Sequence, residues 1–143
     1  RLEKGYRAWG ADIGPDHSPI EAGLAWAVKD RSTVEFLGRG AIVAQRKNGV
    51  RKRLAGFTTS GDVVLLGRET IYRDGERVGW LSSAGYGYTI ERSIGYGYVR
   101  HPGGVTPEFI RSGSYELEVA TERIPCEVSL QPLYDPVGER VRS

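Results

Sequence analysis

The stretch YELEVATERIPCEVSL, residues 115–130, alternates apolar and polar side chains in two successive runs. The apolar positions of the two runs are Tyr115, Leu117 and Val119, and then Ile124, Cys126, Val128 and Leu130. A period of two is typical of a β-strand that buries only one face. The stretch therefore predicts two adjacent antiparallel strands, with the thiol of Cys126 on the buried side as an inert core group.

Turn signals extend this β pattern over residues 51–134. Glycine supplies 20 of the 143 residues, and Asp74-Gly75 is a preferred pair for a two-residue type I′ hairpin loop. Such a loop would place Arg73 opposite Glu76, Tyr72 opposite Arg77, and Ile71 opposite Val78. Two GYGY repeats, residues 85–88 and 95–98, are spaced as on two neighbouring strands. Five or six strands separated by glycine turns predict a small closed barrel or a sandwich.

Residues 1–50 have a mixed pattern. The positions Leu2, Tyr6 and Trp9 form a weak helical stripe. The sequence SPIE at residues 18–21 fits a capping box, and residues 24–28 alternate like a short strand. Helix-forming residues predominate over residues 36–48, with a stop at Asn48-Gly49.

The expected fold class is mainly β, with a small α+β N-terminal segment followed by a small antiparallel β-barrel. We expect residues 1–50 to be the end of a neighbouring α+β unit, residues 51–134 to form the barrel, and residues 135–143 to be an extended tail. The chain begins at Arg1 and contains no methionine, so we expect a piece of a longer protein.

Composition excludes several classes of protein. No apolar run approaches the roughly 18 residues of a membrane-spanning helix. The single cysteine excludes an internal disulfide framework and a multi-cysteine zinc site. A net charge of +2 is too small to imply nucleic-acid binding by itself.

The motifs that suggest chemistry also have ordinary structural explanations. The glycine repeats lack the third glycine of a dinucleotide-binding fingerprint, because Ile90 and Arg100 stand at those positions. The basic run within residues 46–53 straddles a helix end and is expected to be a solvated face, with an anion or partner-protein contact as the alternative. His17 lies in a polar loop and His101 precedes a turn, and neither has the spacing of a metal site.

Glu3 leaves two interpretations open. Beside Arg1 and Lys4 it could form an ordinary surface ion pair. A carboxylate can instead accept two parallel hydrogen bonds from a planar edge such as that of a guanine or a pterin.

Several strings together resemble the aminomethyltransferase family, whose best-known member is the glycine-cleavage T-protein. They are RLEKGYRAWGAD at residues 1–12, SPIEAGLAW at 18–26 and EFLGR at 35–39. Others are similar to the C-terminal region of sarcosine and dimethylglycine dehydrogenases: RKRL at 51–54, GYGYV at 95–99 and PLYDP at 132–136. The resemblance covers essentially the whole chain.

The resemblance implies both a fold and a chemistry. The family's final domain is a small β-barrel, and the segment before it belongs to the tetrahydrofolate-binding part. In the flavoenzymes, an upstream FAD domain oxidises an N-methyl amine, and tetrahydrofolate takes up the one-carbon unit. The implied partners are the amine, folate and the upstream domains of the same protein, without nucleic acid or membrane. Such proteins are mitochondrial in eukaryotes and cytoplasmic in bacteria.

Three positions carry over as folate-binding residues. Glu3 matches the family glutamate that grips the pterin edge. Arg31, or Lys29 as an alternative, falls where a basic residue meets the p-aminobenzoyl-glutamate tail. Tyr134 falls near an aromatic position at the C-terminal edge of the pocket.

The family's catalytic aspartate lies upstream of the position of Glu3, so this chain is expected to contain no catalytic residue and to be inactive alone. Two other functions remain open. The chain could be the C-terminal part of a glycine-cleavage aminomethyltransferase, or a non-catalytic barrel for oligomer or partner contacts.

Overall fold

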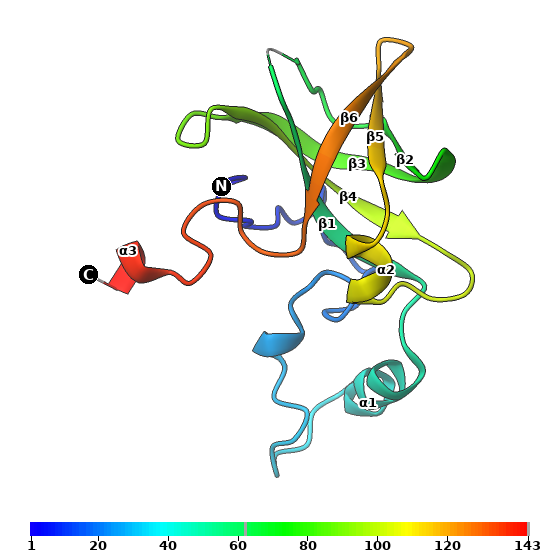
Figure 1. Cartoon of the computed structure of the whole chain (residues 1–143). Helices are drawn as coiled ribbons and strands as arrows, with labels where there is room; N and C mark the ends of the chain where they lie inside the picture. Colours follow the sequence, from blue (N-terminus) through cyan, green and yellow to red (C-terminus); the bar gives the residue numbers. More distant parts are fainter. Residues whose placement is uncertain (62, 143) are drawn as a thin grey trace.

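The computed structural model describes residues 1–61 and 63–142, and its centre is a closed barrel of antiparallel strands (Figure 1). The strands are β1 (Lys52–Thr59), β2 (Thr70–Arg73), β3 (Glu76–Gly87), β4 (Arg92–Arg100), β5 (Tyr115–Val119) and β6 (Glu122–Ser129). Their order around the barrel is β1-β4-β3-β2-β5-β6, and the pairing of β6 with β1 closes it. The predicted small antiparallel β-barrel is confirmed.

Strands β3 and β4 pair closely because glycine stands where side chains would collide. The two GYGY repeats lie on these neighbouring strands, as predicted, with Gly95 opposite Ala84. Gly97 lies opposite Leu81, and a Cβ on Gly97 would overlap the carbonyl oxygen of Trp80. No side chain larger than hydrogen fits there.

The core fills the inside of the barrel. Its fully buried side chains include Phe57, Ile71, Leu81, Val99, Ile110 and Leu117. Strands β5 and β6 are adjacent and antiparallel, as their alternation predicts, and Tyr115 lies opposite Cys126. Cys126 is half-buried and packs against this core, and burial raises the pKa of its thiol to about 12.

The Asp74-Gly75 hairpin forms as predicted, with φ of 51° and 84° at its two loop residues. Its first two strand pairs are also as predicted. The third is wrong, because a register shift places Ile71 opposite Gly79 instead of Val78. A bulge of this kind adds one residue to one strand and increases its twist.

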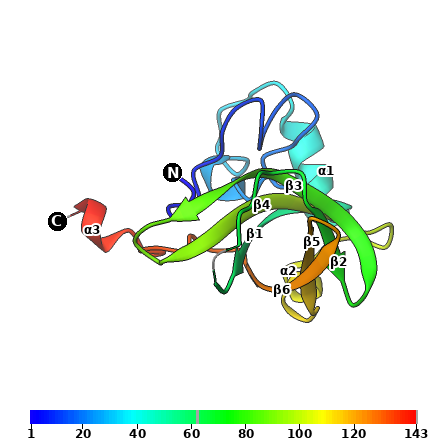
Figure 2. The ribbon, with the colours of Figure 1, turned by 90° about the horizontal axis from the view of Figure 1, so that it is seen from above.

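Residues 1–50 contain fewer regular elements than predicted and cover the outer side of β3 and β4 (Figure 2). The helix predicted over residues 36–48 is present as α1 (Arg39–Asn48); it begins three residues later than predicted and stops before Gly49, which has φ of 77°. The capping box is also confirmed, since the Glu21 amide donates to Ser18 Oγ (3.1 Å) and the Ser18 amide donates to Glu21 Oε2 (2.9 Å). The capping box closes a turn, and no α-helix begins there.

Two predictions for this segment are wrong. The predicted helix near Leu2, Tyr6 and Trp9 is a series of turns, with Gly5 and Gly10 at φ of 66° and 90°. The predicted strand over residues 24–28 is the short 3₁₀ helix η1 (Ala25–Ala27). A strand needs a hydrogen-bonded neighbour, and the closed barrel offers no free edge.

The expected extended tail is also wrong, because residues 135–138 turn into the short helix α3 (Glu139–Arg142). Asp135 Oδ1 accepts the amide of Glu139 (2.9 Å) and so begins that helix. Helix α2 (Pro107–Arg111) buries Ile110 in the barrel core and is capped by Thr106. Among the described residues, no helix has the length and apolar character needed to cross a membrane.

Candidate functional site

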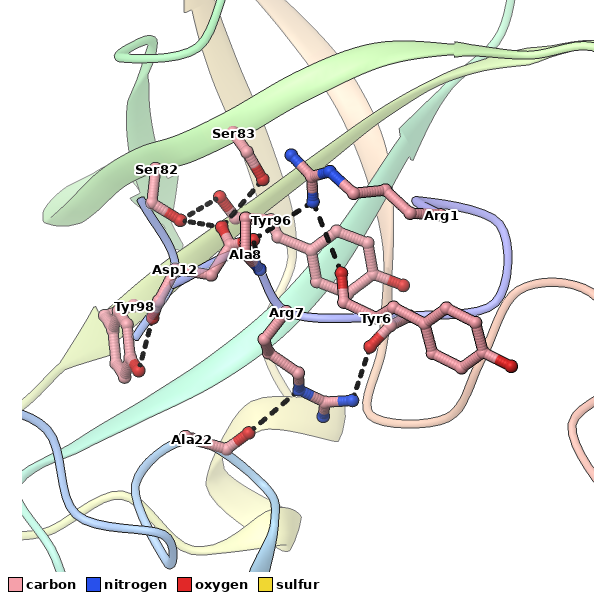
Figure 3. Close-up of polar contacts among 11 residues, drawn as sticks. Arg1, Tyr6, Arg7, Ala8, Asp12, Ala22, Ser82, Ser83, Tyr96 and Tyr98 are labelled. Carbon is pink, nitrogen blue, oxygen red and sulfur yellow. Dashed lines mark hydrogen bonds and ion pairs between the residues drawn. The ribbon is translucent and has the colours of Figure 1, made fainter. Parts of the chain in front are cut away.

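The buried carboxylate of Asp12 is one attachment of the N-terminal segment to the barrel (Figure 3). Asp12 is 1% exposed. Its Oδ1 accepts the hydroxyls of Ser82 (2.6 Å) and Ser83 (2.7 Å) on β3. Its Oδ2 accepts the amide of Ala8 (2.9 Å) and Nη1 of Arg1 (3.1 Å). A buried charge needs such partners, so this cluster fixes residues 1–12 on the barrel.

The backbone of Asp12 is fixed as well. Tyr98, on β4, donates its hydroxyl to the Asp12 carbonyl (2.8 Å), and His17 stacks on the Tyr98 ring with centroids 4.4 Å apart. Burial raises the pKa of Tyr98 and lowers that of His17. Both groups are therefore held in their neutral forms.

Glu3 does not form the ion pair that was one of its two interpretations. Arg1 pairs with Asp12, and Lys4 Nζ pairs with Asp135 Oδ2 (2.8 Å). Glu3 instead binds the β3–β4 hairpin tip: Oε1 accepts the amides of Thr89 (2.6 Å) and Ile90 (3.1 Å).

The second carboxylate oxygen of Glu3 also binds the hairpin tip, since Oε2 accepts the Thr89 hydroxyl (3.1 Å). Burial would raise the pKa of Glu3, but the hydrogen bonds from Thr89 and Ile90 outweigh it and lower the pKa. Glu3 is thus held as a carboxylate.

Tyr134 lies beside Glu3 although 131 positions separate them in the sequence. The Tyr134 amide donates to the Glu3 carbonyl (2.9 Å). The Tyr134 ring has cations on it from two segments, with Lys4 Nζ 6.0 Å and Arg140 Cζ 5.5 Å from its centroid. The structure therefore brings together two of the three predicted folate-binding residues.

Arg31 lies apart from that pair. It is exposed in the loop between η1 and α1, as is Lys29. This loop forms the lower end of the molecule in Figure 1, well below the N-terminus.

The acceptor positions of Glu3 decide how a pterin edge would fit. A carboxylate offers about two lone-pair directions on each oxygen. Oε1 already accepts two amides and Oε2 accepts one hydroxyl, so one position remains, on Oε2. A parallel pair of bonds to a pterin edge needs a free position on both oxygens. In this arrangement the Glu3 carboxylate can accept one hydrogen bond from a pterin edge, but not the parallel pair.

The other motifs are structural. Among the described residues, no group of histidine, cysteine and acidic side chains could hold a metal ion. His101 Nδ1 accepts the Gly103 amide (3.2 Å), which agrees with the predicted turn.

The basic run is only partly a solvated face. Arg46 pairs with Asp30 (2.7 Å), Lys52 donates to the Asp16 carbonyl (2.7 Å), and half-buried Arg53 donates to the Val105 carbonyl (3.4 Å). These side chains mostly turn inward, to acceptors on the protein.

Neither the Asp12 cluster nor the partners of Glu3 could be predicted from the sequence. Ser82 and Ser83 stand next to each other, where strand alternation sends them to opposite faces, yet both reach Asp12. The register between β3 and β4 shifts between Leu81 and Ser83, which explains how both can do so. The donors of Thr89 and Ile90 are backbone amides, so residue types do not reveal them.

Comparisons with known proteins agree on one family. The model of the glycine cleavage T-protein C-terminal barrel domain matches residues 52–135. Mitochondrial sarcosine dehydrogenase of Mus musculus is 43% identical over 143 residues, which are 99% of this chain and 16% of that protein. The mitochondrial pyruvate dehydrogenase phosphatase regulatory subunit of Mus musculus is 36% identical over 93% of this chain and 16% of its own length.

A solved structure is similar throughout. The aminomethyltransferase T of the glycine cleavage system from Bartonella henselae matches with a TM-score of 0.78 and 26% identity, over 95% of this chain and 37% of that one. The chain thus spans 16% of the length of these curated relatives.

Proposed function

Because this chain belongs to the family of glycine cleavage T-protein C-terminal barrel domains, we propose that it is the tetrahydrofolate-binding C-terminal portion of a flavoenzyme similar to sarcosine or dimethylglycine dehydrogenase. It would help to transfer a one-carbon unit from an N-methyl amine to tetrahydrofolate. The observation that carries this proposal is the 43% identity to sarcosine dehydrogenase over 99% of the chain.

Bound tetrahydrofolate would supply the acceptor of the one-carbon unit, and FAD in the upstream domains would supply the oxidation. The residues of this chain bind and orient. Glu3 offers one acceptor position beside the ring of Tyr134, on a segment that the Asp12 cluster fixes. Arg31 would meet a more distant part of the ligand, with the upstream domains forming the walls between.

This chain holds no catalytic residue in the proposal, so the isolated 143-residue chain should not turn over sarcosine, dimethylglycine or an aminomethyl donor. Turnover by the purified chain would contradict this division of roles. The whole protein would be mitochondrial in a eukaryote and cytoplasmic in a bacterium.

A calorimetric titration of the full-length protein with tetrahydrofolate tests the role of Glu3. Glu3→Gln removes the charge and one acceptor oxygen, so affinity should fall about tenfold, which corresponds to one charge-assisted hydrogen bond. Thr89→Ala is the matched control, because it removes the hydroxyl on Oε2 and leaves Glu3 intact. Its affinity should be unchanged or higher.

Equal affinities in the parent, Glu3→Gln and Thr89→Ala would show that Glu3 only holds the hairpin. Amide exchange at Thr89 and Ile90 separates that structural role, since both amides should exchange faster in Glu3→Gln whether or not folate binds.

Two other functions have support. The structural match to an aminomethyltransferase T favours the C-terminal part of a glycine-cleavage enzyme, which would carry no flavin absorption in its full-length form. The 36% identity to a protein named as a regulatory subunit favours a non-catalytic module. A full-length protein that binds no tetrahydrofolate would select the latter.

A further inference from the structure

A shallow cavity of about 330 Å³ opens where β1 begins and β4 ends, and we name it the β1–β4 pocket. Its lining residues are Glu21, Arg51, Lys52, Arg100, His101 and Pro102. The two strands are joined here, since Lys52 lies opposite Arg100 and the His101 amide donates to the Arg51 carbonyl (3.0 Å). The backbone under the pocket is therefore held by the hydrogen bonds between β1 and β4.

This pocket is remote from Glu3. Glu3 contacts the hairpin tip before β4 begins, whereas the pocket lies at the last residue of β4. Figure 1 shows the arrowhead of β4 on the side away from the N-terminus. The strand from Arg92 to Arg100 spans roughly 26 Å at 3.3 Å per residue.

Positive charge in the pocket exceeds negative charge. Three cations, Arg51, Lys52 and Arg100, line it with one carboxylate, Glu21. Glu21 lies 3.8 Å from Lys52 Nζ, so it compensates one of the three cations. Two positive charges are left without a carboxylate in the lining.

The Arg100 side chain is held in place, but several of its N–H donors have no acceptor among the described residues. Its Cζ lies 4.1 Å from the centre of the Trp80 ring, and its Nη1 donates to the Tyr98 carbonyl (3.2 Å). A guanidinium has five N–H donors, and this contact uses one. Burial lowers the pKa of Arg100.

The other donors in the pocket are also available. The Arg51 side chain is exposed and makes no hydrogen bond or ion pair within the described part of the chain. His101 Nδ1 accepts the Gly103 amide, so the neutral ring carries its proton on Nε2. The His101 ring packs on Phe109 with centroids 4.7 Å apart, which limits its rotation.

We propose that the β1–β4 pocket binds a multiply charged oxyanion, a phosphate group or clustered carboxylates, with Arg51 and Arg100 as its charge partners. Lys52 adds to the positive field, and His101 Nε2–H is a further donor. An oxyanion is the ligand that two guanidinium groups without a carboxylate partner recognise. The site needs no folate and lies apart from Glu3, so it stands independently of the function proposed above.

The test is an NMR titration of the 143-residue chain with inorganic phosphate at constant ionic strength. We expect saturable shifts, with millimolar affinity, at the Trp80 indole and at the amides around Arg51 and His101. Glutarate in a parallel titration distinguishes the sources: tighter phosphate binding indicates a phosphate-bearing ligand, and tighter glutarate binding a carboxylate-bearing one. Either result supports an oxyanion site.

Variants locate the binding. Arg51→Gln should weaken phosphate binding about two- to fivefold, the range of a partly exposed ion pair, and adding Arg100→Gln should abolish it. Arg111→Gln on α2 is the control, since it removes the same charge from an exposed residue outside the pocket. The proposal is overturned if no saturable shift occurs in the millimolar range, or if Arg111→Gln weakens binding as much as Arg51→Gln does.

Discussion

Replacement of Asp12 should destabilise the chain more than any change at its ion-pair partner. The Asp12 carboxylate is 1% exposed and accepts hydrogen bonds from Arg1, Ala8, Ser82 and Ser83. In Asp12→Ala all of these donors lose their acceptor. The loss in free energy of unfolding differs from one donor to the next.

The size of the destabilisation depends on whether each donor has another acceptor or can be hydrated. The Arg1 side chain is 41% exposed and can be hydrated, so loss of its ion pair costs about 0–1 kcal/mol. Ser82 keeps a second acceptor, the Tyr96 carbonyl at 3.1 Å. Among the described residues, the buried Ser83 hydroxyl and the part-buried Ala8 amide have no second acceptor, and a buried donor without an acceptor costs about 1–3 kcal/mol. At about 1.5–2 kcal/mol for each of these two donors, Asp12→Ala should cost about 3–4 kcal/mol.

Urea unfolding of the 143-residue chain measures this. With a slope of about 2 kcal/mol/M, Asp12→Ala should lower the midpoint by about 1.5–2 M. Asp12→Asn keeps the shape and one acceptor, and serine hydroxyls can reverse to accept its amide, so about 1–2 kcal/mol is expected. Arg1→Ala is the matched control, at about 0–1 kcal/mol. If Asp12→Ala is no more destabilising than Arg1→Ala, the buried cluster does not hold the N-terminal segment.

Three further outcomes test the barrel and its cover. Gly97→Ala should destabilise by about 1–3 kcal/mol in urea, because its Cβ meets the backbone of β3, whereas Gly40→Ala, in open space on α1, should be neutral or slightly stabilising. Cys126, with its thiol pKa raised to about 12, should react slowly with a thiol reagent at pH 8, and rapid labelling of the native chain would contradict its burial. Burial lowers the pKa of His17 from 6.5, so its contribution to stability is complete above pH 6.5 and is lost as the pH falls through the lower folded value; in His17→Gln that slope should be smaller, and an unchanged slope would exclude His17 as its source.

The parts of the fold that could be predicted are those whose signal is local. Alternation over residues 115–130 gave strands β5 and β6, and the Asp74-Gly75 pair gave the hairpin between β2 and β3. The expected closed barrel of the aminomethyltransferase type is confirmed, also by the match to a solved aminomethyltransferase T. Helix α2 was missed although Thr106-Pro107 is a readable start signal, because five residues are too few for periodicity.

The wrong predictions share a cause outside the local sequence. Residues 24–28 alternate like a strand, but all edges of the barrel strands are already paired, so the segment has no neighbour and coils instead. The stripe through Leu2, Tyr6 and Trp9 has helical spacing, but Gly5 and Gly10 adopt positive φ, and the neighbouring Arg1 and Lys4 bind Asp12 and Asp135. Tertiary contacts outweighed weak propensity in both cases.

The candidate site depends on contacts that residue types do not encode. Family resemblance pointed to Glu3 and Tyr134, and no periodicity could have joined positions 131 apart. The main partners of Glu3 are the amides of Thr89 and Ile90, which any residues except proline would supply. Its folate-binding role, like that of Arg31 and Tyr134, stays a prediction.

Three side chains in the first four residues explain how that site is assembled. Arg1 binds buried Asp12, Glu3 binds the tip of the β3–β4 hairpin, and Lys4 binds Asp135 ahead of α3. The N-terminal segment therefore joins the barrel to the C-terminal tail without contributing a strand. Tyr134 reaches Glu3 only because Lys4 and the Glu3 carbonyl hold the tail there. The β1–β4 pocket has the opposite construction, since paired strands hold Lys52 and Arg100 directly. Loosening of residues 1–12 would thus disperse the Glu3 site, whereas Lys52 and Arg100 would stay in place on the paired strands, so the two sites can be perturbed separately.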